Sequence, residues 1–76
     1  MATLLTIPKL EMSMTEGTLA EWMMESGTVV TEGEVIYLLE TDKTAREIEA
    51  PASGTLIQKV ADGQTYPVGT EIGEIV

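Results

Sequence analysis

Short apolar stretches alternate with polar turns along the whole chain. Runs rich in Thr, Val, Ile and Leu are separated by glycine, proline and acidic residues at intervals of roughly eight to twelve residues, which is typical of an all-β domain. Residues 19–25 come closest to a helix in composition, but the glycines at positions 17 and 27 favour a strand there. We predict strands at residues 3–7, 17–23, 28–30, 35–40, 45–49, 54–60, 65–67 and 71–75.

The chain also contains two copies of one pattern. Residues 17–19 (Gly-Thr-Leu) recur as residues 54–56, and Ile36 then corresponds to Ile72 after a one-residue adjustment. Two short β units that cannot close a core alone can do so by packing face to face. The repeat therefore predicts a single 1–76 domain with pseudo-twofold symmetry.

The repeated apolar positions are the expected core. Ile36 and Leu39 are three residues apart, which does not fit strict alternation in a strand, so we expect a bulge or a strong twist in that strand. Trp22 is expected to be a partly buried packing residue. The predicted core is Ile7, Leu19, Val29, Ile36, Leu39, Ile48, Leu56, Ile72 and Ile75.

Composition excludes several classes of function. The net charge is −9 with only four basic residues, which argues against nucleic-acid binding and against anionic membrane surfaces. The chain has no cysteine and no histidine, so a disulfide framework, a Cys- or His-type metal site and the usual proton shuttle are all absent. No stretch is long and apolar enough to cross a bilayer, and the N-terminus lacks a signal-peptide pattern. We expect a cytoplasmic location, or the mitochondrial matrix if the chain derives from a longer eukaryotic precursor.

The most distinctive turn is Thr41-Asp42-Lys43-Thr44, between two predicted strands. Asp is a good turn former because its side chain can hydrogen-bond local backbone N–H groups. A tight hairpin here would place Lys43 at the outermost point of the domain, where its amine is open to acylation. A solvated lysine paired with Asp42 is the simpler interpretation for an arbitrary hairpin. Lys43 differs because the chain has so few competing amines.

These residues support a specific family resemblance. Residues 40–44 (Glu-Thr-Asp-Lys-Thr), followed by residues 48–54 (Ile-Glu-Ala-Pro-Ala-Ser-Gly), closely resemble the lipoylation motif of the acyltransferase components of 2-oxoacid dehydrogenase complexes. Residues 8–17 resemble the loop before the second strand in the pyruvate- and acetoin-type members, and residues 61–69 resemble the closing segment. The resemblance covers essentially the whole chain.

The resemblance implies a fold and a modification. The fold is a flattened β-barrel or sandwich of two four-stranded antiparallel sheets. Lys43 would receive lipoic acid in amide linkage, from a lipoyl ligase or by an octanoyl transferase and lipoyl synthase route. In this family the modifying enzyme depends on an acidic residue three positions before the lysine, an acidic neighbour, and a glycine eleven positions after it. Here these are Glu40, Asp42 and Gly54.

The implied role is that of a carrier, with no catalysis by the domain itself. The lipoyl group on Lys43 would act as a swinging arm that carries acyl groups and reducing equivalents between active sites. Its partners would be a thiamine-dependent decarboxylase, the acyltransferase core and a flavoprotein dihydrolipoyl dehydrogenase. Such visits are brief, so weak and partly electrostatic docking is expected. The candidates for an acidic docking surface are Glu11, Glu16, Glu40, Glu47 and Glu49.

Three features and three alternatives bear on this interpretation. Glu11 stands where many relatives have glycine, Thr44 where alanine or valine is common, and Arg46 at a usually apolar position. A biotinyl domain shares the fold but has its lysine in Ala-Met-Lys-Met, whereas Asp42 and Thr44 flank the lysine here. An interaction module without any cofactor is the second alternative. An enzyme is the poorest interpretation, because a protruding turn offers no enclosed pocket.

Overall fold

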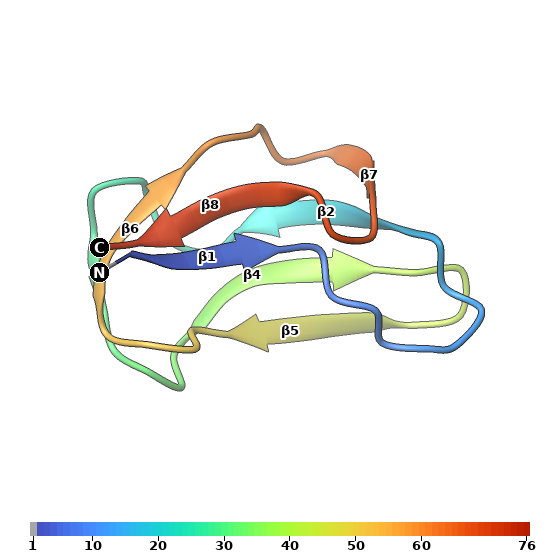
Figure 1. Ribbon diagram of the computed structural model, residues 1–76, viewed down its shortest axis with the longest axis horizontal. Helices are drawn as coiled ribbons and strands as arrows, with labels where there is room; N and C mark the ends of the chain where they lie inside the picture. Colours follow the sequence, from blue (N-terminus) through green and yellow to red (C-terminus); the bar gives the residue numbers. More distant parts are fainter. Residues whose placement is uncertain (1) are drawn as a thin grey trace.

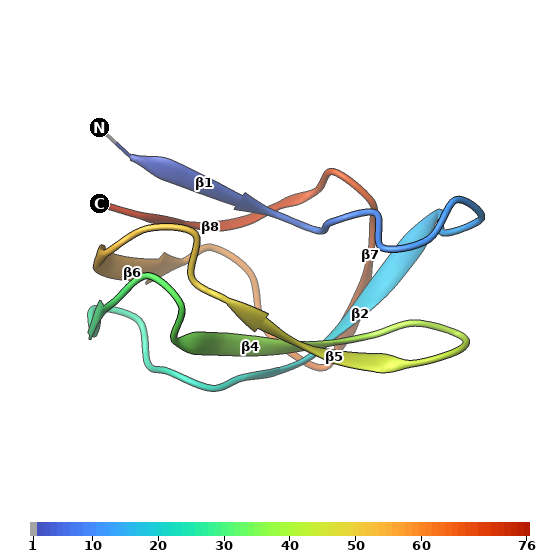
Figure 2. The ribbon, with the colours of Figure 1, turned by 90° about the horizontal axis from the view of Figure 1, so that it is seen from below.

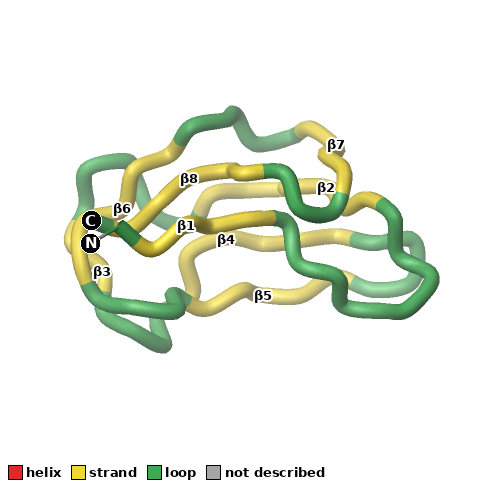
Figure 3. Tube along the Cα trace, in the orientation of Figure 1, coloured by secondary structure: helices red, strands yellow, loops and turns green. Residues whose placement is uncertain are grey.

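The computed structural model describes residues 2–76, and this part of the chain contains eight β-strands and no helix (Figures 1 and 3). The all-β prediction is confirmed, and each predicted strand lies within two residues of an observed one at either end. The absence of a helix in the described residues also means that no helix there is long and apolar enough to cross a membrane. The strands are β1 (Thr3–Thr6), β2 (Glu16–Trp22), β3 (Val29–Val30), β4 (Val35–Glu40), β5 (Ala45–Glu49), β6 (Gly54–Gln58), β7 (Gln64–Pro67) and β8 (Glu71–Ile75).

The strands form two four-stranded antiparallel sheets that face each other as layers (Figure 2). One sheet has the order β1-β8-β6-β3 and the other β5-β4-β2-β7. The two halves of the chain correspond strand by strand: β1 to β5, β2 to β6, β3 to β7 and β4 to β8. Exchanging each strand for its counterpart converts one sheet order into the other. Each sheet therefore contains strands from both halves, and neither half forms a sheet without the other. This exchange confirms the pseudo-twofold repeat predicted from the sequence.

The space between the sheets is filled by aliphatic side chains that alternate along the strands. Nearly all of the predicted core is buried, and Ile48 is half-buried against it. The prediction for Val29 was wrong: this side chain is 74% exposed, whereas Val30 is 1% exposed. Strand β3 is only two residues long, so its own sequence has no alternation that could reveal which valine faces inward. The buried hydrophobic residues are Leu5, Ile7, Met14, Leu19, Val30, Ile36, Tyr37, Leu39, Ala50, Leu56, Ile72 and Ile75.

Strand β4 contains the expected irregularity. Its register with β5 shifts between Val35 and Tyr37, so Ile36 and Tyr37 are both buried although they are adjacent. Burial raises the pKa of Tyr37 to about 12. Trp22 packs edge-to-face on Tyr37 with ring centroids 5.4 Å apart, and its Nε1 donates to the Val60 carbonyl at 3.1 Å. Trp22 is thus the partly buried packing residue that was predicted.

The elongated molecule measures 32 × 20 × 20 Å and has two different ends. The chain termini lie side by side at one end, which we call the terminal end (Figures 1 and 2). The β4–β5 turn and the β1–β2 loop lie together at the other, which we call the lysine end (Figures 1 and 2). The fold therefore presents the β4–β5 turn as far as possible from the termini.

Candidate functional site

The lysine end is built around the two-residue turn that joins β4 to β5. Backbone N–H of Thr41 donates to the Thr44 carbonyl at 2.7 Å, which leaves Asp42 and Lys43 as the central residues. The favoured two-residue hairpin turns need positive φ at a central residue. No non-glycine residue among 2–76 has positive φ, so this turn is closed in another way.

The side chain of Thr41 closes the turn. Its Oγ1 accepts from the backbone N–H of Lys43 at 3.3 Å and from that of Thr44 at 3.2 Å. The prediction gave this task to Asp42, but the recorded side-chain bonds of the turn come from the hydroxyl one position earlier. Serine and threonine hydroxyls can close turns in the same manner as Asp. The clue in the sequence was the threonine immediately before the Asp-Lys pair.

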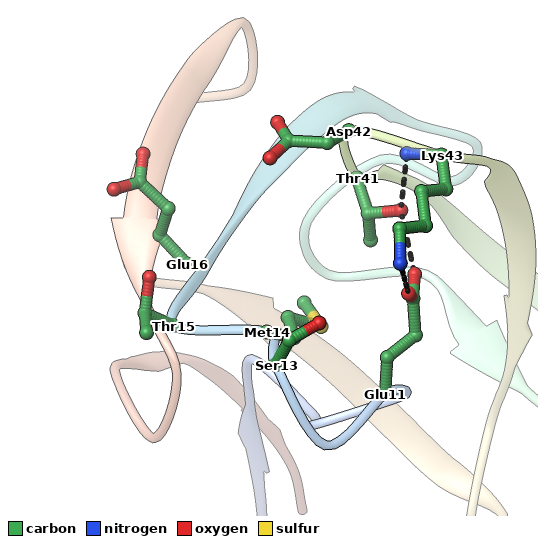
Figure 4. A pocket seen from close by; sticks show the side chains of 8 residues that line it. All are labelled: Glu11, Ser13, Met14, Thr15, Glu16, Thr41, Asp42 and Lys43. Carbon is green, nitrogen blue, oxygen red and sulfur yellow. Dashed lines mark hydrogen bonds and ion pairs between the residues drawn. The ribbon is translucent and has the colours of Figure 1, made fainter.

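Lys43 is at the tip of the turn, and its side chain is 72% exposed. The prediction that the hairpin presents this residue outward is confirmed. Its amine lies 3.6 Å from the Glu11 carboxylate oxygen Oε2 (Figure 4). The other Glu11 oxygen, Oε1, is 3.2 Å from the Thr41 hydroxyl. One carboxylate therefore contacts both the residue that closes the turn and the lysine that the turn presents.

The β1–β2 loop holds Glu11 in this place. Met14 is buried, and its Sδ accepts a hydrogen bond from the Leu10 backbone N–H at 3.3 Å. The Met14 N–H in turn donates to the Glu11 carbonyl at 3.1 Å, which makes residues 11–14 a tight turn. Gly17 leaves space for Met14, because a Cβ at position 17 would lie 2.9 Å from Met14 Cε. The loop is thus anchored in the core through Met14.

A hollow of about 70 Å³ separates the loop from the turn (Figure 4). The structure brings Glu11, Glu16, Asp42 and Lys43 together around it. The other acidic candidates lie elsewhere: Glu40 ends β4, and Glu47 and Glu49 are exposed along β5. The predicted acidic surface is therefore divided into residues around the hollow and residues along the hairpin. The residues that line the hollow are Glu11, Ser13, Met14, Thr15, Glu16, Thr41, Asp42 and Lys43.

Gly54 belongs to the terminal end, far from Lys43 (Figure 1). A Cβ at this position would lie 2.6 Å from the Val76 carbonyl oxygen and 2.8 Å from Ile75 Cγ2. Its φ of +156° is also unusual for a residue with a side chain. Packing in the folded domain therefore requires glycine at position 54, independently of any modifying enzyme.

The surroundings of Lys59 differ from those of Lys43. Lys59 donates a hydrogen bond to Glu71, which raises its pKa, and its amine lies 3.9 Å from Glu74. Lys59 is thus held between two carboxylates of β8, and its side chain is 39% exposed. Lys43 pairs with Glu11 at 3.6 Å, which is longer than the hydrogen bond between Lys59 and Glu71, and its side chain has nearly twice the exposure of Lys59. The amine at the turn is the more accessible of the two.

The site can accept a covalently attached acyl group. The Lys43 amine protrudes from an open surface, and the small polar residues beside it leave room for a chain to extend into solvent. The hollow is shallow, and the chain has no histidine or cysteine to act in it. The geometry thus fits attachment of an acyl group to the amine of Lys43 through an amide bond.

Comparison with known proteins agrees with this geometry. The family profile described as "Biotin-requiring enzyme", which covers biotinyl and lipoyl attachment, matches residues 3–75. The chain is 44% identical over 70 residues to the dihydrolipoyllysine-residue acetyltransferase component of the acetoin cleaving system of Cupriavidus necator, which covers 91% of the chain and 19% of that protein.

Relatives from a second system are equally similar. The dihydrolipoyllysine-residue succinyltransferase components of the 2-oxoglutarate dehydrogenase complex from Rickettsia typhi and Bacillus subtilis are 42% and 43% identical over 77 and 70 residues. These alignments cover 99% and 91% of the chain, but 19% and 17% of the two relatives. The chain thus spans about a fifth of the length of these proteins.

Proposed function

Because the chain belongs to the biotinyl/lipoyl attachment family, we propose that it is a lipoyl carrier domain with the attachment site at Lys43. The observation that supports this most directly is the placement of an exposed amine on a two-residue turn, at the end of the molecule opposite the termini. An acyl group on this amine extends away from the fold, so the attachment changes no packed contact.

We propose lipoic acid, in amide linkage, as the attached group. Asp42 and Thr44 flank the lysine, where biotinyl domains have methionines. When bound, the dithiolane of a lipoyl group supplies reversible disulfide chemistry and a thiol that can hold an acyl group. The domain itself contributes placement: Thr41 fixes the turn, and the anchored loop fixes the surface beside it.

We propose that the carrier serves a 2-oxoacid dehydrogenase complex. The similar proteins bear the names of acyltransferase components of acetoin and 2-oxoglutarate systems. Within this class, the loop sequence Ser13-Met14-Thr15 favours the pyruvate or acetoin type. The partners are a thiamine-dependent decarboxylase, an acyltransferase core and a flavoprotein dihydrolipoyl dehydrogenase. Modification is by lipoyl ligase or by octanoyl transferase and lipoyl synthase.

The first test is the intact mass of the folded chain after incubation with lipoyl ligase, ATP and lipoate. We expect a gain of one lipoyl group. Lys43→Arg is the matched control, because it keeps the charge at the turn but removes the acceptor amine, and it should show no gain. Labelling of Lys43→Arg, or no labelling of the wild type by an enzyme active on another substrate, would contradict the proposal and favour the biotinyl or cofactor-free alternative.

We propose two roles for the candidate residues around the lysine. Glu40, Asp42 and Gly54 serve recognition by the modifying enzyme, with Gly54 acting through the fold because it lies far from the lysine. The residues proposed to dock to the decarboxylase through charge are Glu11, Glu16, Glu47 and Glu49.

Docking can be tested by charge reversal on the lipoylated domain. Glu47→Lys with Glu49→Lys should slow reductive acylation severalfold, mainly at low ionic strength. Glu25→Lys with Glu32→Lys, at two exposed positions outside the β4–β5 hairpin, makes the same change in net charge and is the control. Equal rates for the β5 variant and the wild type would remove these two residues from the docking surface.

A further inference from the structure

The contacts of Glu11 are not explained by attraction of a distant partner. Its side chain is only 28% exposed, and both of its oxygens face groups of the β4–β5 turn (Figure 4). Oε1 lies 3.2 Å from the Thr41 hydroxyl, and Oε2 lies 3.6 Å from the Lys43 amine. A residue used only for steering would be expected to point into solvent.

The two contacts differ in what acylation does to them. Acylation forms a bond from Lys43 Nζ to the carbonyl carbon of an activated donor, such as an acyl adenylate. The bond from that carbon to the phosphate oxygen breaks, and the nitrogen releases two protons to solvent. The amide that results has no charge, so the ion pair with Glu11 exists only before acylation. The contact with the Thr41 hydroxyl remains afterwards.

We propose that Glu11 is a positioning residue for the acylation of Lys43. One carboxylate oxygen orders the turn through Thr41, and the other holds the amine against the β1–β2 loop until the modifying enzyme takes it. This inference rests on the proposed attachment at Lys43. The two contacts have opposite effects on the rate of acylation. The contact with Thr41 orders the turn and favours acylation. The contact with Lys43 must break before the lone pair of the amine can attack.

The strength of the ion pair suits a temporary restraint. Lys43 is 72% exposed and the separation is long, and exposed pairs of this kind are weak and sensitive to salt. The restraint is therefore expected to slow acylation by a factor of about two to five and to disappear at high salt. The anchoring of the loop through buried Met14 keeps Glu11 in position while the lysine moves away.

Glu11→Gln separates the two contacts. The amide oxygen of Gln still accepts from Thr41, but its side chain has no charge to hold the ammonium. The variant is treated with a limiting amount of an acetyl N-hydroxysuccinimide ester, and acetylation is mapped by mass spectrometry. Exposed Lys9 serves as the reference amine within each molecule. We expect the ratio of Lys43 to Lys9 labelling to rise about two- to fivefold over wild type at low salt, and the difference to vanish near 1 M salt.

Two further variants complete the test. Glu32→Gln makes the same change in net charge away from the site and should leave the ratio at the wild-type value. Glu11→Ala removes both contacts, so with lipoyl ligase its kcat/KM should be two- to fivefold below that of Glu11→Gln. If the ratio of Lys43 to Lys9 labelling were unchanged in Glu11→Gln, or rose equally in Glu32→Gln, the proposal that Glu11 restrains the Lys43 amine would be overturned. Equal kcat/KM for Glu11→Ala and Glu11→Gln would overturn the ordering of the turn.

The proposed function can fail separately. The acetylation arm uses no enzyme, so its result does not depend on which group the cell attaches. If wild type is not lipoylated by an active ligase, the proposed function is rejected, and the positioning role for that reaction with it. If wild type is lipoylated but the Glu11 variants behave as wild type in both assays, the positioning role alone is rejected.

Discussion

The two ends of the molecule are counterparts under the pseudo-twofold symmetry, yet they are held together differently. The turn that joins β4 to β5 corresponds to the position between the end of β8 and the start of β1. At the terminal end the strands are tied by their backbones: Thr55 and Val76 exchange hydrogen bonds of 2.7 and 2.9 Å, and Gly54 has no room for a Cβ. At the lysine end one backbone bond, from the Thr41 N–H to the Thr44 carbonyl, is supplemented by the side chains of Thr41 and Glu11.

This difference explains how one end can be modified without cost to the fold. At Gly54 the backbone of the terminal end leaves no room for a side chain, because a Cβ would meet the Val76 carbonyl oxygen. The turn at Lys43 is stabilised by a hydroxyl and a carboxylate on neighbouring residues, and the lysine side chain itself takes no part in the core. We therefore expect the stability of the domain to depend on the terminal end and its chemistry on the lysine end.

The largest effect is expected for Gly54→Ala. The added Cβ would approach the Val76 carbonyl to 2.6 Å, and strain of the backbone adds to the overpacking, so we expect a loss of about 3 kcal/mol or more in the free energy of unfolding. Urea denaturation at neutral pH measures it. Gly33→Ala is the matched control: φ there is +95° but no atom lies within 4 Å of the new Cβ, which isolates the backbone strain at about 1 kcal/mol.

Lys43→Ala should change the same free energy by less than about 0.5 kcal/mol, because the side chain is exposed. If Lys43→Ala lowered the free energy of unfolding as much as Gly54→Ala, stability would not depend mainly on the terminal end, and the contrast would be contradicted.

The next effect concerns Tyr37 on β4, the strand that leads into the turn at the lysine end. The unfolded phenol ionises near pH 10, whereas burial keeps the native phenol neutral up to a pKa of about 12. The unfolded state therefore loses its proton first. The free energy of unfolding should fall as the pH rises from about 10 to about 12, by up to about 2.7 kcal/mol.

Denaturant titrations across this pH range measure the effect, and Tyr37→Phe should remove it. If the free energy of unfolding of Tyr37→Phe fell by the same amount over this pH range, other groups would be the cause of the pH dependence.

Much of the fold was predictable because it is encoded locally. Glycine, proline and acidic turns separate the apolar runs, and the internal repeat placed strands in both halves at once. The three-residue separation of Ile36 and Leu39 even indicated the irregularity in β4. Val29 was misplaced because a two-residue strand has no alternation of its own, and only the pairing of Val30 with Gly54 determines which valine faces inward.

The site was predictable in its chemistry but not in its contacts. Lys43 was identifiable from its turn and its neighbours in the sequence. The contacts of Glu11 with Thr41 and Lys43 join residues about thirty positions apart, and no local pattern predicts that the β1–β2 loop reaches the turn. The glycine at position 54 is similar: the motif marks it as important, but its close approach to Val76 is visible only in the folded chain.

A smaller effect than that of Tyr37 is expected for the side chain that closes the turn at the lysine end. Thr41→Val keeps the shape of the side chain but removes the acceptor for the N–H groups of Lys43 and Thr44 and the contact with Glu11. The turn is exposed, so water can replace these bonds, and we expect a loss of only about 1 kcal/mol in the free energy of unfolding. The local effect should be larger: amide exchange of Lys43 and Thr44 should accelerate while that of Thr55 is unchanged. Thr44→Val is the control, because its own hydroxyl makes only a 3.5 Å contact with the Ala45 carbonyl. If Thr41→Val loosened the terminal end as much as the turn, side-chain contacts at the lysine end would be part of the global fold, and the contrast between the two ends would be lost.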